Sequence, residues 1–102
     1  MITVIQIGLG PLGQQIGKYI DDKEEVKTIA AVDINNDLRN QDFGELINGE
    51  SSGVLIQNTI EEALQNLPEK PAAAILTTVS SIQKLESQIE NIAKHGIPIV
   101  ST

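Results

Sequence analysis

Seven residues near the start of the chain, residues 7–13, have the types and spacing of a phosphate-binding loop. Three glycines stand in the pattern Gly-x-Gly-x-x-Gly, at Gly8, Gly10 and Gly13. Gly8 allows the chain to turn sharply out of a strand, and Gly10 has no Cβ, so a pyrophosphate can approach the backbone. Gly13 allows the following helix to pack closely on the preceding strand. The pattern therefore predicts a loop that holds the pyrophosphate of a dinucleotide.

The loop offers no cation to a phosphate, because no Lys or Arg stands between Met1 and Gly17. The backbone N–H groups of the first helical turn, together with the positive end of the helix dipole, must therefore bind the anion. Pro11 suits the first helical position, where its missing N–H matters little. We expect the following residues to bind the cofactor: Gly8, Leu9, Gly10, Pro11, Leu12 and Gly13.

An acidic residue, Asp33, stands twenty residues beyond Gly13. At this distance from the glycines a carboxylate accepts hydrogen bonds from the ribose hydroxyls of NAD. A 2′-phosphate at the same place would meet a like charge, and the next basic residue along the chain is Arg39. We therefore expect NAD as the cofactor, with NADH preferred over NADPH. The alternative interpretation is that Asp33 only begins a polar turn.

The elements on either side of the loop are those that the pattern requires. Residues 2–7 are β-branched except for Gln6 and predict a buried strand. Residues 12–20 repeat apolar side chains at helical spacing, and residues 28–32 predict a second strand that ends at Asp33. This context makes the motif far more specific than the glycines alone. The alternative is a βαβ unit that keeps its glycines for packing only.

The rest of the chain continues to alternate helices and strands. Gly49 and Gly96 each end a predicted helix, while Thr59 and Ser80 each cap one. Because parallel strands are joined by right-handed crossovers, we expect an α/β fold: a Rossmann-type doubly wound parallel sheet of five strands in the order 3-2-1-4-5. The predicted elements are a helix over 38–48, a strand over 54–56, a helix over 59–67, a strand over 72–77, a helix over 80–96 and a strand over 97–101.

Composition narrows the class of protein. The 102 residues suit one domain, and 14 acidic against 7 basic residues give a net charge of −7, which argues against nucleic acid or an anionic membrane surface as a partner. The chain has no cysteine, so it has no disulfide or thiolate metal site. The first strand leaves no room for a signal peptide, and no apolar run reaches the length of a membrane span. We expect a soluble cytoplasmic protein.

The chain resembles the amino-terminal domain of the dihydrodipicolinate reductase family, and within it the branch that includes 2,4-diaminopentanoate dehydrogenase-like proteins. Three stretches carry the resemblance: residues 4–14 (VIQIGLGPLGQ), 74–81 (AILTTVSS) and 95–102 (HGIPIVST). Homoserine dehydrogenase-like proteins share these motifs. The resemblance implies NAD(P)H-dependent reduction, or the reverse oxidation, by the parent protein.

The resemblance also places the adenine ribose at Asp33 and the nicotinamide ribose near Thr77 and Thr78. The predicted fold agrees, because ligands of such sheets bind beyond the carboxyl ends of the strands. Thr77 and Thr78 are equally compatible with a strand end followed by an ordinary turn. The family continues past the fifth strand into a substrate domain that supplies the proton donor. We therefore expect residues 1–102 to be a dinucleotide-binding fragment that is not catalytic alone.

Two further expectations concern regulation and assembly. A hypothesis from a different class is a stand-alone nucleotide-sensing regulatory module. Residues 97–101 form a terminal strand whose apolar outer edge invites pairing with a second copy, although Pro98 disfavours a regular ladder.

His95 is the only histidine, at the end of the last helix, and we expect no catalytic role for it. We also expect no metal site, because no ligand spacing suits one.

Overall fold

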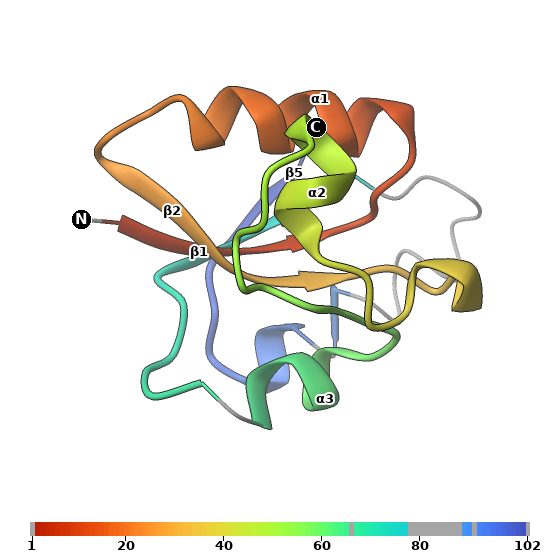
Figure 1. Cartoon of the computed structure of the whole chain (residues 1–102). Helices are drawn as coiled ribbons and strands as arrows, with labels where there is room; N and C mark the ends of the chain where they lie inside the picture. The colour runs from red at the N-terminus through yellow and green to blue at the C-terminus, as the bar shows by residue number, and fades with distance from the viewer. Residues whose placement is uncertain (1, 66, 78–88, 91, 102) are drawn as a thin grey trace.

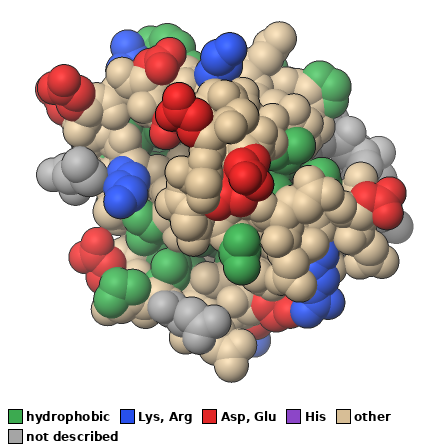
Figure 2. Space-filling model, in the orientation of Figure 1, with side chains coloured by type: hydrophobic (Ala, Val, Ile, Leu, Met, Phe, Trp, Pro, Cys, Tyr) green, Lys and Arg blue, Asp and Glu red, His purple; other side chains and the backbone are tan. Residues whose placement is uncertain are grey.

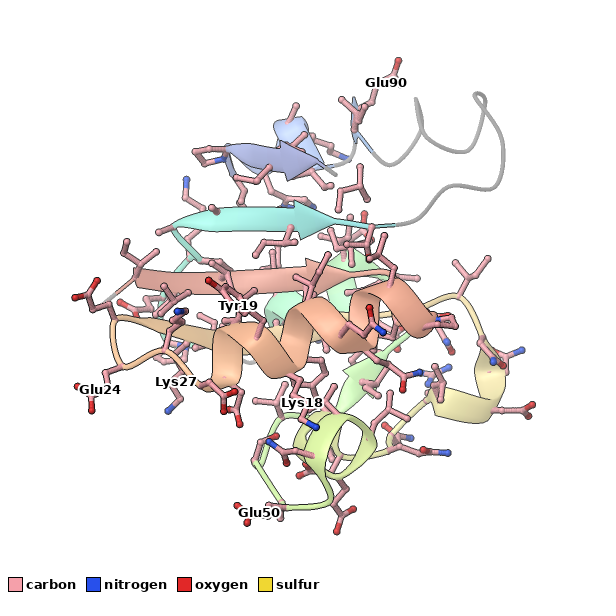
Figure 3. All side chains as sticks on the ribbon, turned by 90° about the horizontal axis from the view of Figure 1, so that it is seen from above. Lys18, Tyr19, Glu24, Lys27, Glu50 and Glu90 are labelled. Atoms are coloured by element: carbon pink, nitrogen blue, oxygen red, sulfur yellow. The ribbon has the colours of Figure 1, made fainter. Side chains whose placement is uncertain are left out.

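The computed structural model of the chain describes residues 2–65, 67–77, 89–90 and 92–101. Their five strands form one parallel sheet in the order β3-β2-β1-β4-β5, which confirms the predicted fold class and strand order. Figure 3 shows this order across the sheet. The elements are β1 (Ile2–Ile7), α1 (Pro11–Asp21), β2 (Val26–Val32), a 3₁₀ turn η1 (Asn36–Leu38), α2 (Phe43–Asn48), β3 (Ile56–Gln57), α3 (Ile60–Gln65), β4 (Ala73–Leu76) and β5 (Ile99–Ser101).

Helices cover both faces of the sheet, as the right-handed crossovers require (Figure 1). One face carries α1 and α2, and the other carries α3 and the helical residues 89–90 and 92–94. The larger core cluster joins the sheet to α3 through buried aliphatic side chains, among them Ile5, Ile7 and Ile60. A smaller cluster under α2 centres on Phe43. Val4 and Gln6 are buried as well as Ile5 and Ile7, so the central strand β1 is buried on both faces.

The predicted helix over residues 38–48 is wrong, because the structure divides this segment between η1 and α2. Between the two, Asn40 has a positive φ of 65°. The N–H of Asn40 donates to the carbonyl of Ile56 at 2.7 Å, and the N–H of Ile56 donates to the carbonyl of Gln41 at 2.9 Å. Pairing with Ile56, the first residue of β3, therefore replaces the helical hydrogen bonds there.

A cap inside the same segment starts the second helix. The Asp42 carboxylate accepts from the N–H of Glu45 at 3.1 Å and so begins α2 at Phe43. The same carboxylate accepts from the N–H groups of Ser52 and Gly53, each at 2.9 Å. These bonds, with that of Ser52 first, hold the pKa of Asp42 well below its usual range. The predicted end of the helix at Gly49 is confirmed, with a φ of 79°.

The other predicted elements shift only at their ends. The third strand is Ile56–Gln57 rather than 54–56, because Leu55 forms only an isolated antiparallel bridge with Asp42. The hydroxyl of Thr59 accepts from the N–H of Glu62 at 3.1 Å, which confirms the predicted cap of α3. Most of the predicted helix over 80–96 lies outside the described residues.

Two findings bear on the surface. Within the described ranges, no helix is long and apolar enough to cross a membrane. On the face shown in Figure 2, acidic and basic side chains are dispersed over the surface, as expected of charges spread along the whole sequence.

Candidate functional site

The glycine loop, residues 8–10, joins β1 to α1 at the carboxyl edge of the sheet. β1 has β2 and β3 on one side and β4 and β5 on the other, so the order of strands reverses at this loop. Ligands of parallel α/β sheets bind at such a switch point. The helix that follows lies over β1 and β2 and directs its amino end toward the same edge (Figure 3). The fold thus puts the loop where a ligand would bind.

Two glycines of the loop have different reasons to be glycine. Gly8 has a φ of 96°, a conformation that favours glycine, so the predicted sharp turn is confirmed. Gly10 has a φ of −69° and a ψ of −174°, which any residue can adopt. Among the described residues beyond its two chain neighbours, no atom lies within 4 Å of a Cβ added to Gly10. Neither backbone conformation nor packing therefore requires glycine at position 10, and the space beside it is open.

The third glycine packs α1 onto β1, as predicted. A Cβ added to Gly13 would overlap the carbonyl oxygen of Gly8 and lie 2.8 Å from Oγ1 of Thr77. One turn later, a Cβ at Gly17 would lie 2.8 Å from the ring of Phe43. The fully buried Gln6 of β1 donates from Nε2 to the carbonyl of Gly13. Only glycines allow this approach of helix to strand.

The amino end of α1 is suited to an anion. The N-cap residue, Gly10, has no side chain that could cap this end, and Pro11 occupies the first turn as predicted. The N–H of Gln14 makes the first intrahelical bond, to the carbonyl of Gly10 at 2.9 Å. The N–H groups of Leu12 and Gly13 come before this first intrahelical donor and lie at the positive end of the helix dipole. These donors can bind a phosphate without a cation.

Asp33 contacts the loop directly, which sequence reasoning missed. Its Oδ2 accepts from the N–H of Leu9 at 2.6 Å, and its Oδ1 accepts from the N–H of Asn35 at 2.8 Å. The second bond is the polar turn that the alternative interpretation described. Each carboxylate oxygen has two lone pairs, so both can still accept from a ligand. Asp33 therefore positions the glycine loop and keeps capacity for a further contact.

Thr77 also positions the loop. Its hydroxyl lies 2.7 Å from the carbonyl oxygen of Gly8 and 3.2 Å from that of Ile7. A hydroxyl has a single proton, and that of Thr77 is donated to these carbonyls. Toward a ligand, Thr77 can therefore only act as a hydrogen-bond acceptor. The residue ties β4 to the end of β1. Thr78, the other predicted site residue on this connection, lies outside the described residues.

Two polar side chains that were not predicted as site residues complete this edge. Asn58 donates from Nδ2 to the carbonyl of Asp33 at 2.8 Å. Glu62, in the first turn of α3, lies 2.5 Å from Nη2 of Arg39. Asn58 could have been predicted from the sequence, because it is an amide shortly after a predicted strand. The ion pair of Arg39 with Glu62 could not, because no sequence pattern relates the two residues.

Neither metal nor histidine chemistry is indicated in the described part of the chain. No group of three potential ligands gathers there. His95 lies beside α3, with its Nε2 3.9 Å from Oε1 of Glu61. What the site offers is a set of backbone donors, one carboxylate and one hydroxyl at the edge of the sheet.

The sequence of nearly the whole chain matches a known protein family. Residues 2–102 match the family described as dihydrodipicolinate reductase, N-terminus. The 4-hydroxy-tetrahydrodipicolinate reductase of Acaryochloris marina is 22% identical over 101 residues, which are 98% of this chain and 37% of that protein. The chain thus spans well under half the length of this curated relative.

Two solved structures share the fold. The amine dehydrogenase from Mycobacterium smegmatis superposes with a TM-score of 0.87 at 24% identity, over 98% of this chain and 29% of that one. The UDP-D-quinovosamine 4-dehydrogenase from Vibrio fischeri gives a TM-score of 0.74 at 19% identity, over 98% of this chain and 76% of that one. The narrower resemblance to 2,4-diaminopentanoate dehydrogenase-like proteins stays a prediction.

Proposed function

Because the chain belongs to the dihydrodipicolinate reductase N-terminal family, we propose that residues 1–102 are a dinucleotide-binding domain that holds NAD(P)H on the glycine loop. Gly10 carries this proposal. Its backbone conformation suits any residue, and among the described residues beyond its chain neighbours no atom lies within 4 Å of a Cβ placed there. A bound group is therefore a reason for glycine in addition to its preference at an N-cap. The amino end of α1, whose N-cap residue Gly10 has no capping side chain, suits a pyrophosphate.

The proposed contacts combine the geometry of the described residues with the sequence prediction for Thr78. Backbone N–H groups of the loop and of the first turn of α1 would bind the pyrophosphate. Asp33 would accept from the hydroxyls of the adenine ribose, and Thr77 and Thr78 would lie near the nicotinamide ribose. When bound, the dinucleotide supplies or accepts the hydride of the parent oxidoreductase. The family match supports this role over that of a regulatory sensing module.

Binding can be tested by the thermal stability of the 102-residue chain. A ligand at about a hundredfold excess over its Kd stabilises the folded state by about 2.7 kcal/mol. For a domain of this size each kcal/mol raises Tm by roughly 4–8 °C. NADH and ADP-ribose should therefore both raise Tm by roughly 10–20 °C at that excess. No change in Tm with either ligand at millimolar concentration would contradict the proposal.

We further propose that NADH is preferred over NADPH. The negative charge of Asp33 would repel a 2′-phosphate on the ribose that it contacts. Asp33→Asn should narrow the difference in Kd between the two cofactors, because the amide keeps an acceptor for the N–H of Leu9 but has no charge. Asp33→Ala should also narrow it, with added disturbance of the loop. Equal Kd values for NADH and NADPH in the unmodified chain would refute the preference.

Catalysis and assembly are the remaining parts of the proposal. Hydride transfer needs an acceptor held about 3–3.5 Å from the nicotinamide and a proton donor. We propose that the parent protein supplies both elsewhere and that this chain alone is inactive; steady NADH oxidation by the pure chain with cyclic imines would contradict this.

Val100 is 54% exposed on the edge strand β5, which supports self-association there. Self-association can be measured by light scattering.

A further inference from the structure

Arg39, the only arginine of the sequence, is held by α3. Its Nη2 lies 2.5 Å from Oε2 of Glu62, and the two side chains are 47% and 34% exposed. The other oxygen of the same carboxylate accepts from the hydroxyl of Thr59 at 3.1 Å, while Thr59 accepts from the N–H of Glu62. The cap of α3 therefore orients Glu62, which presents its second oxygen to Arg39.

The ion pair is connected to Asp33 by hydrogen bonds. Asn58, directly before Thr59, donates from Nδ2 to the carbonyl oxygens of Asp33 at 2.8 Å and of Asn35 at 3.4 Å. The start of α3 and the connection after β2 therefore meet at the residue proposed to bind the adenine ribose. Arg39 belongs to that connection, after the turn η1.

Arg39 is the cation best placed to reach this edge of the sheet. In the described connections that follow β1, β2 and β3 (residues 8–10, 33–42 and 58–59), it is the one Lys or Arg. Lys27, by contrast, lies at the opposite end of the sheet, where β2 begins (Figure 3). Lys23 lies over the ring of Tyr19 at the carboxyl end of α1.

The chemistry of the two cofactors makes this pair important. NADPH differs from NADH by a phosphate on the 2′ position of the adenine ribose, and a guanidinium binds phosphate through two parallel N–H groups. A free Arg39 would offset the negative charge of Asp33 and could donate hydrogen bonds to that phosphate. Paired with Glu62, it is engaged elsewhere, and Glu62 itself adds a second carboxylate to the same edge.

We infer that Glu62 is a specificity-determining residue, which favours NADH over NADPH by holding Arg39 in an ion pair away from the 2′ position. The inference rests on the proposed function and names a residue that decides the cofactor. Glu62 acts through Arg39 and is thus a positioning residue. The effect is on the difference between the two cofactors and not on binding of the dinucleotide as such.

The test is the ratio of Kd values for NADPH and NADH, measured by calorimetry on the 102-residue chain at one ionic strength. Glu62→Gln keeps the side-chain length and an acceptor for the Thr59 hydroxyl but removes the charge that holds Arg39. The ratio should fall about two- to fivefold, the range that an exposed ion pair spans. The Kd for NADH should stay close to that of the unmodified chain.

Three controls separate this effect from loosening of α3. Thr59→Ala weakens the same cap and removes one hydrogen bond to Glu62 but keeps the Glu62 charge, so it should change the ratio less than Glu62→Gln does. In the double variant Glu62→Gln with Arg39→Gln, the gain in NADPH affinity should disappear, and the ratio of Kd values should return to that of the unmodified chain. Arg39→Gln alone should barely change the ratio, because Arg39 is already engaged by Glu62.

The outcomes that overturn the inference are distinct from failure of the proposed function. A ratio unchanged by Glu62→Gln, or a gain that persists in the double variant, would overturn it. A several-fold loss of NADPH affinity in Arg39→Gln alone would also overturn it and would serve as the deciding result if Glu62→Gln did not fold. If neither cofactor bound the unmodified chain, the proposed function would fail, and this inference with it.

Discussion

Gly10→Val should separate ligand binding from folding. The backbone at Gly10, with a φ of −69° and a ψ of −174°, accepts a β-branched residue. In the part of the chain that the structure describes, no atom beyond the two chain neighbours lies within 4 Å of the new Cβ. Losing glycine's freedom in the unfolded chain favours folding by about 0.4–1 kcal/mol. Valine is a poorer N-cap than glycine by about 1 kcal/mol. These effects oppose each other, so Tm without ligand should change by less than about 8 °C.

The effect on binding should be far larger. The branched side chain would fill the open space in which we place the pyrophosphate, so the stabilisation of about 2.7 kcal/mol at a hundredfold excess of NADH should disappear. Thermal scans of both chains with and without NADH measure the two effects together. We expect a rise of roughly 10–20 °C for the unmodified chain and none for Gly10→Val.

Two results would refute the reasoning. If Gly10→Val kept the full rise in Tm with NADH, the pyrophosphate would not lie beside Gly10. If the variant without ligand lost much more than about 8 °C, the space beside Gly10 would not be open. Gly10→Ala, with one carbon in place of three, provides a graded comparison and should lose less of the NADH effect than valine.

Two further changes test the structure without any ligand. Gly13→Ala should lower stability by about 1–3 kcal/mol in urea titrations, because its Cβ would overlap the Gly8 carbonyl; a loss no greater than that of Gly10→Ala would contradict the packing of α1. Asp42→Asn should be less stable than the unmodified chain at pH 7, and this difference in stability should shrink below about pH 4. The reason is that folding lowers the pKa of the Asp42 carboxyl, so its charge stabilises the fold above the unfolded pKa. That stabilisation is lost as the pH falls through the folded pKa. Equal differences at pH 7 and pH 3 would refute the role of the Asp42 charge.

Much of the fold was readable from short stretches of sequence, because local chemistry decides those features. The turn at Gly8 depends on one backbone conformation, and the cap at Thr59 on a hydroxyl three residues from its donor. Strand order followed from the alternation of elements and the handedness of crossovers, and the structure confirms it. The helix over 38–48 failed because its hydrogen bonds go to Ile56, a partner that no local pattern indicates.

The site shows the same division. Sequence spacing alone brought Gly8, Gly10 and Gly13 to the end of a strand and put Asp33 at the end of the next, since parallel strands carry their carboxyl ends to one edge. Only the tertiary structure joined Asp33 to the N–H of Leu9, Thr77 to the carbonyl of Gly8, and Arg39 to Glu62. Each of these bonds spans 23 residues or more of chain. Their geometry depends on how far strands and helices are offset across the sheet, and residue order does not encode that offset.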